Sequence, residues 1–250
     1  MTDDVKGPEL GFSGMRARVE PHRKREVLRW ALALYLAWTL TWVAYSTVVS
    51  RAWPSLGRGA PGTIFWSACK LVVWLLPVLV IVRRSRREAP LAWLGLDHAR
   101  GLARGVVATV LFVGLAALVD ARVPGQWPVP AVPNRQPVPE ILLIALWGPF
   151  VEEVLFRGYV LRSLLEAGTT FWRANLMATS LFALLHVPGW LFHGLTVADC
   201  AVFGLRVGFL GFLFGALRVR GASLWPSVLM HVVNNAWRAG WLLFAWDAMT

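Results

Sequence analysis

Residues 148–159 read Gly-Pro-Phe-Val-Glu-Glu-Val-Leu-Phe-Arg-Gly-Tyr, an apolar segment that carries two adjacent glutamates and one arginine. A carboxylate at membrane depth is costly unless another group pairs with it or uses it. Glu153 and Arg157 are four residues apart on one helical face, an arrangement that favours an ion pair. Glu152 points to another face, so we expect it to remain unpaired by the arginine and to meet a group on a different helix. The alternative is an ion-paired cluster that only holds helices together.

The composition around this segment indicates an integral membrane protein. The 250 residues are 57% hydrophobic and only 16% charged, with a mean hydropathy of +0.55. A helix needs about 20 apolar residues to cross a bilayer, and we expect an all-α, polytopic transmembrane helical bundle of about seven spans, with a range of about six to eight. The predicted spans are residues 30–49, 63–82, 102–119, 139–161, 175–192, 196–217 and 225–246.

The basic residues predict which side of the membrane each connection occupies. The net charge is +11, and the arginines and lysines gather beside the span ends rather than on a soluble face. By the positive-inside rule, the N-terminus and the connections after the second, fourth and sixth spans are cytoplasmic. Nucleic acid is therefore not an expected partner, because attraction to the anionic lipids of the bilayer explains these charges. The basic segments are residues 16–29, 83–104, 162–173 and 218–220.

Two further predicted spans carry ionisable or amide side chains. Phe182 lies one turn before His186 on the same face and can close the space beside it. A lone intramembrane histidine is most often a packing residue, but an unpaired glutamate on the preceding span favours a pair of Glu152 with His186. In the last span, His231 and Asn235 share a face and can donate hydrogen bonds to one point. Polar interhelical contact is the alternative for this pair.

Amide hydrolysis is the chemistry that these groups suit. Rise per residue places Glu152, His186 and His231 in the middle or inner part of the bilayer. Glu152 can act as general base for a water that His186 orients, while His231 and Asn235 donate to the oxyanion. Zinc is the rival interpretation, since the glutamates and histidines could hold it. The HExxH pattern is missing, however, and a zinc site would still need a base, so we expect no cofactor.

These residues resemble the motifs of the CPBP family, the CAAX-processing and bacteriocin-processing intramembrane proteases, also called the Abi or Rce1-like family. The resemblance covers about residues 139–246. It implies a multi-span endopeptidase of the glutamic type, with the first glutamate as base and the first histidine sharing its water. The second histidine and the asparagine would form the oxyanion hole, and an earlier description of the family as metalloproteases keeps zinc as a minority possibility. The motifs, in order, are EExxxR at Glu152, Glu153 and Arg157, FxxxH at Phe182 and His186, and HxxxN at His231 and Asn235.

The resemblance also implies partners and a location. We expect a membrane-tethered peptide or protein as substrate and a place in the bacterial inner (cytoplasmic) membrane; members that resemble myxosortases process C-terminal anchors. One alternative is a proton-coupled transporter that uses the same groups as a relay, although no inverted repeat is evident. A non-catalytic bacteriocin-immunity or scaffold protein is another.

The same reasoning divides the chain into four parts. We expect a polar, basic arm over residues 1–26 and leading transmembrane spans with a basic cytoplasmic loop over residues 27–120. A proline-rich outer loop over residues 121–138 follows, and a catalytic transmembrane core occupies residues 139–250.

Overall fold

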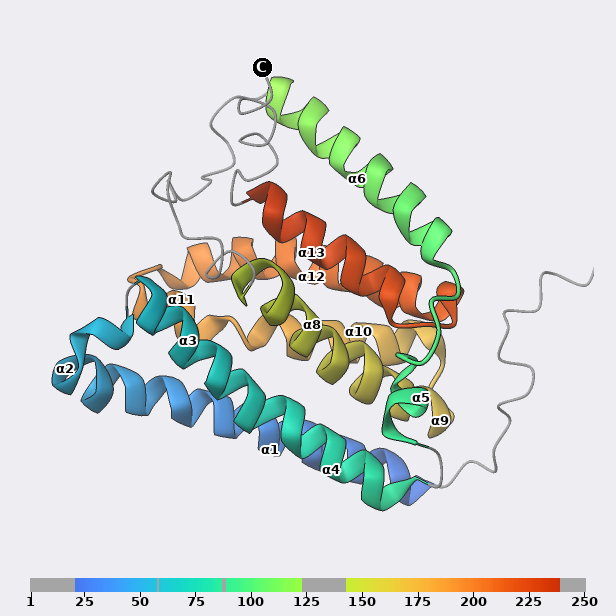
Figure 1. The fold of residues 1–250 in the computed structure, drawn as a ribbon, viewed down its shortest axis with the longest axis horizontal. Helices are drawn as coiled ribbons and strands as arrows, with labels where there is room; N and C mark the ends of the chain where they lie inside the picture. Colours follow the sequence, from blue (N-terminus) through green and yellow to red (C-terminus); the bar gives the residue numbers. More distant parts are fainter. Residues whose placement is uncertain (1–20, 58, 87–88, 123–142, 239–250) are drawn as a thin grey trace, which may run out of the picture.

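The computed structural model describes residues 21–57, 59–86, 89–122 and 143–238, and these ranges consist of helices and their connections, without a strand (Figure 1). The predicted all-α class is therefore confirmed for the described residues. The helices in chain order are α1 (Pro21–Ala44), η1 (Tyr45–Val49), α2 (Ser50–Ala52), η2 (Pro54–Gly57), α3 (Gly59–Lys70), η3 (Leu71–Leu75), α4 (Leu76–Ser85), α5 (Pro90–Leu94), α6 (Leu102–Arg122), η4 (Leu143–Trp147), α8 (Gly148–Glu153), η5 (Val154–Leu161), α9 (Arg162–Glu166), α10 (Phe171–Leu184), α11 (Val187–Phe192), α12 (Val197–Gly221) and α13 (Trp225–Arg238).

Four helices in the described ranges are long and apolar enough to cross a membrane. They span Lys24–Ala52, Gly59–Ser85, Phe171–Phe192 and Val197–Gly221, and α6 contributes a shorter apolar stretch. The other two predicted spans fall on the helices from η4 to η5 and on α13. Their outer parts, residues 139–142 and 239–246, lie outside the described residues, as do most of the basic arm and of the proline-rich loop.

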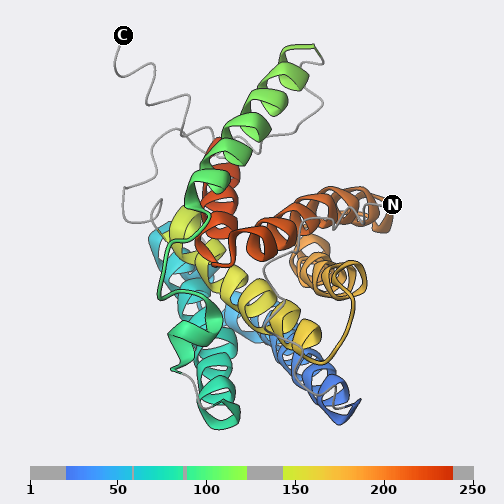
Figure 2. The same ribbon diagram turned by 90° about the vertical axis from the view of Figure 1, so that its right-hand side faces the viewer.

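The segment with the two glutamates occupies the middle of the molecule. Helices η4, α8, η5 and α9 follow one another as one rod, with α1 and the α3–α4 pair packed along one flank (Figure 1). Helices α10 and α12 cover another flank, α13 packs on α8 and α12, and α6 packs on α13 (Figure 2). Residues 151–161 are buried throughout. The polar side chains among residues 151–161 therefore need partners inside the protein.

The fifth predicted span is interrupted, which the sequence reasoning did not predict. Helix α10 ends at Leu184 and α11 begins at Val187, with a turn between them. Pro188 occupies the first turn of α11, where its missing N–H and fixed φ are tolerated, and it has no N–H to donate to the carbonyl of Leu184, the last residue of α10. His186 consequently lies at a helix junction rather than in a helix interior.

The basic connections that were predicted to share one side of the membrane are in contact. Arg86, after α4, forms an ion pair of 3.0 Å with Glu166 at the end of α9. Arg104, at the start of α6, donates to the carbonyl of Arg220 at the end of α12 over 3.0 Å. Three connections that are far apart in sequence therefore meet at one end of the bundle.

Candidate active site

Glu152 is bound to a lysine from a different part of the chain. Its side chain lies near the end of α8 and only 7% of the residue surface is exposed. Oε1 accepts a hydrogen bond of 2.7 Å from Nζ of Lys70, the last residue of α3. Glu152 thus meets a group on a different helix, as expected, although that group is a lysine that belongs to none of the three motifs. Residue spacing indicates partners on the same helix only, and Lys70 lies 82 residues before Glu152.

Glu153 holds both Arg157 and His231. Its Oε1 accepts 2.9 Å hydrogen bonds from Arg157 Nη1 and from His231 Nδ1, and neither Glu153 nor Arg157 has any exposed surface. The predicted pair of Glu153 and Arg157 is confirmed. Because a carboxylate only accepts hydrogen bonds, Nδ1 of His231 carries a proton. The other nitrogen, Nε2, lies 3.7 Å from Oε2 of Glu152, so this imidazole is bonded to Glu153 and faces Glu152.

Arg157 is fixed from several sides. Its Nη2 donates to the carbonyl of Gly211 on α12 over 2.7 Å. The guanidinium lies 4.4 Å from the ring centroid of Phe182 and 5.3 Å from that of Phe214, distances at which a cation is attracted to an aromatic ring. A Cβ atom at Gly211 would lie 2.8 Å from Nη2, so only glycine allows this approach. A fixed Arg157 in turn fixes Glu153 and the orientation of His231.

His186 lies beside the ring of Phe182, which also contacts His231. Nδ1 of His186 lies 2.8 Å from the carbonyl of Phe182, so Nδ1 donates and Nε2 is the acceptor of the neutral ring. The Phe182 ring packs edge-on against both imidazoles, with its centroid 5.0 Å from that of His186 and 5.7 Å from that of His231. Phe182 thus closes the space beside His186, as predicted. The imidazole in contact with Glu152 is that of His231, whereas the sequence favoured His186.

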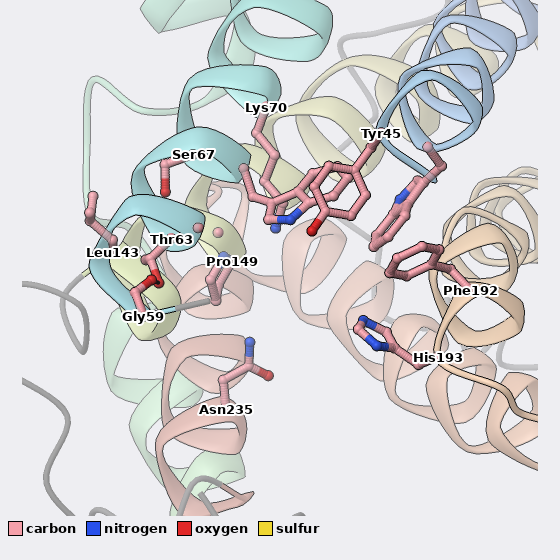
Figure 3. A pocket seen from close by; sticks show the side chains of 14 residues that line it. Tyr45, Gly59, Thr63, Ser67, Lys70, Leu143, Pro149, Phe192, His193 and Asn235 are labelled. Carbon is pink, nitrogen blue, oxygen red and sulfur yellow. Dashed lines mark hydrogen bonds between the residues drawn. The ribbon is translucent and has the colours of Figure 1, made fainter. Parts of the chain in front are cut away.

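A cavity of about 400 Å³ opens beside Lys70. Asn235 faces it from α13, His193 from the turn after α11 and Lys70 from α3, so three elements distant in sequence contribute polar groups (Figure 3). Asn235 also accepts a hydrogen bond of 3.2 Å from Asn234. The sequence reasoning assigned no role to His193, which belongs to none of the three motifs. The lining residues are Trp42, Tyr45, Gly59, Gly62, Thr63, Trp66, Ser67, Lys70, Leu143, Gly148, Pro149, Phe192, His193 and Asn235.

Cationic side chains, rather than the arrangement of a metal site, surround the glutamates. Lys70 binds Glu152 and Arg157 binds Glu153. Across the described ranges, no group of three or more histidine, cysteine, aspartate or glutamate side chains is arranged to hold a metal ion. The donor set of this site therefore suits acid and base chemistry by its own side chains.

The fold and the site together define a helical membrane protein with a buried cluster of glutamate and histidine. Residues 134–237 form a domain of the family described as "Type II CAAX prenyl endopeptidase Rce1-like". Because this is a family of endopeptidases, the match implies peptidase activity. The domain includes all the predicted site residues from Glu152 to Asn235, whereas Lys70 precedes it. Comparison of the chain with curated proteins and with solved structures returns no significant match.

Proposed function

We propose that the protein is an intramembrane endopeptidase of the glutamic type, which hydrolyses a peptide bond in a membrane-tethered protein or peptide. Glu152 is the general base. The observation that supports this role most strongly is the environment of its carboxylate, where Lys70 occupies Oε1 and Oε2 faces His231. One oxygen is thus held, and the other is directed toward an imidazole at a distance too long for a direct hydrogen bond.

The reaction follows from that arrangement. Oε2 of Glu152 accepts a proton from a water molecule while the water oxygen attacks the carbonyl carbon of the scissile amide. His186 orients the same water through its Nε2 acceptor. The tetrahedral oxyanion then receives hydrogen bonds from the Asn235 amide and from His231 when the ring carries both protons. As the C–N bond breaks, Glu152 returns the proton to the leaving amine.

The neighbouring groups prepare this chemistry without taking part in it. Glu153, bound to Arg157, holds Nδ1 of His231 and so fixes the direction in which Nε2 points. The ring of Phe182 packs against both imidazoles and limits their rotation. Preorganised donors of this kind stabilise a developing charge without reorganisation during the reaction.

The cavity beside Lys70 is the proposed entrance for the substrate. Aromatic side chains form one wall, with Trp42 and Trp66 stacked at 4.1 Å and Phe192 at 5.6 Å from Trp42. Asn235 lies on the opposite side in Figure 3. An extended peptide segment with apolar side chains fits a space with an apolar wall and convergent polar groups.

We also propose seven transmembrane spans with a cytoplasmic N-terminus, in the inner membrane of a bacterium. The contacts that join the connections after α4, α9 and α12 support a common side for the basic segments. The four apolar helices of sufficient length support an embedded bundle.

A proteomic comparison tests the function. Membranes from cells with the wild-type protein should contain one polypeptide in a shortened form. Membranes from cells with Glu152→Gln should contain the full-length form of that polypeptide, although the variant is as abundant as the wild-type protein. Glu26→Gln, an exposed glutamate on α1, serves as the matched control and should act as wild type. If the shortened polypeptide persists in the Glu152→Gln membranes, the proposed mechanism is excluded. A transporter or a scaffold would then remain as the alternative function.

A further inference from the structure

We propose that Lys70 is a positioning residue of this site, whose ammonium group keeps Glu152 ionised and directs the free oxygen of that carboxylate toward His231. The inference rests on the proposed role of Glu152 as general base. Lys70 lies on α3, outside residues 134–237 that match the family. The leading helices would thus complete the site rather than only anchor the domain.

The charges around Glu152 single out Lys70 as its counter-ion. Glu153 is the neighbouring carboxylate on α8. It forms an ion pair with Arg157 on η5, with Nη1 of the arginine 2.9 Å from Oε1 of the glutamate. His231 approaches from α13 with both ring nitrogens near carboxylates, and His186 lies close enough at the α10–α11 junction to interact electrostatically. Among the described side chains, Lys70 therefore supplies the cation bound directly to Glu152.

The position of the ammonium is itself restrained. Nζ lies 5.8 Å from the ring centroid of Trp74, which is 1% exposed. It also lies close to Gly148, where a Cβ atom would be 3.1 Å from Nζ. The side chains of Lys70 and Glu152 are 21% and 9% exposed, so solvent screens their attraction only in part. The ammonium group therefore lies close to both Trp74 and the start of α8.

The residue type also fits this role. An ammonium is a compact charge that binds one oxygen, whereas a guanidinium tends to take both oxygens of a carboxylate. A lysine at position 70 leaves Oε2 of Glu152 able to accept a proton. An arginine there would preserve the charge but compete for the oxygen that the reaction needs.

Infrared difference spectroscopy tests the inference without a substrate. Spectra of each purified protein, minus those of its Glu152→Gln form, report the protonation of this carboxyl group as the pH changes. Lys70→Met should move the midpoint upward by about one to three pH units, because the ionised form loses its neighbouring cation. Lys70→Arg should titrate near wild type, and so should Lys24→Met, a matched loss of an exposed lysine on α1. A wild-type midpoint in Lys70→Met overturns the proposal.

Folding and cleavage provide the remaining measurements. If Lys70→Met does not fold, then Lys70→Met/Glu152→Gln should fold, because no buried charge is left unpaired. A double variant that also fails, while Glu152→Gln alone folds, contradicts the inference. With the polypeptide found by proteomics, Lys70→Met should lower kcat at least about tenfold at neutral pH, and Lys70→Arg should lower kcat despite its normal titration. If Lys70→Met keeps the wild-type kcat while Glu152→Gln abolishes cleavage, the role of Lys70 is refuted and the proposed peptidase function stands.

Discussion

Replacing Arg157 with methionine should cause a large loss of stability that a second substitution partly restores. Arg157 and Glu153 have no exposed surface and their charged atoms lie 2.9 Å apart. Without the guanidinium, a buried carboxylate keeps only His231 as a partner, and breaking a buried pair costs about 3–5 kcal/mol. That is a large share of the roughly 5–15 kcal/mol that stabilises a typical protein.

The second substitution identifies the cause. Glu153→Gln/Arg157→Met removes both charges, so the double variant should be more stable than Arg157→Met by about 2 kcal/mol, within the range of measured couplings between contacting residues. Unfolding in mixed micelles can be followed by the fluorescence of the 15 tryptophans. Arg173→Met, at an exposed position of α10, is the control and should unfold as wild type.

Equal stabilities of Arg157→Met and the double variant would contradict an electrostatic role of Arg157. That result would mean that the arginine acts through its packing between Phe182 and Phe214 rather than through its charge. Loss of activity with full stability would instead assign Arg157 to the chemistry.

Two further predictions concern α12 and the cavity. Gly215→Ala should lower the melting temperature, at a cost of about 1–3 kcal/mol, because the new methyl group would collide with the Asn175 side chain where α10 crosses α12, whereas Gly204→Ala on the same helix meets open space and should be tolerated. Asn235→Ala should lower kcat about 100-fold or more with an unchanged melting temperature, because it removes a donor to the oxyanion. A kcat within threefold of wild type, which corresponds to less than about 1 kcal/mol of activation free energy, would remove Asn235 from the mechanism.

Residue spacing was sufficient to predict much of the rod and part of the site. Glu153 and Arg157 pair because four residues bring two side chains onto one helical face, a property that any helix imposes. Pro226 lies in the first turn of α13, where its missing N–H costs nothing and where proline is common in helices. Local geometry governs both features, so the sequence contains the necessary information.

Contacts between segments that are distant in the chain could not be predicted from residue spacing. Lys70 meets Glu152 across 82 residues, and no periodicity relates α3 to α8. His231 bonds to Glu153 because α13 packs against α8, and the register of that packing depends on many side chains at once. The turn at His186 has a local cause in Pro188, but a proline in an apolar segment is also compatible with a kinked continuous helix.

The role of Glu152 as general base is measured most directly with purified protein in lipid vesicles and the polypeptide identified by the proteomic comparison. The account predicts that wild-type protein cleaves this polypeptide at one bond and that Glu152→Gln, equally folded, cleaves it at least about 100-fold more slowly, the contribution expected of a general base. Cleavage by Glu152→Gln at the wild-type rate would contradict the assignment of Glu152 as the base.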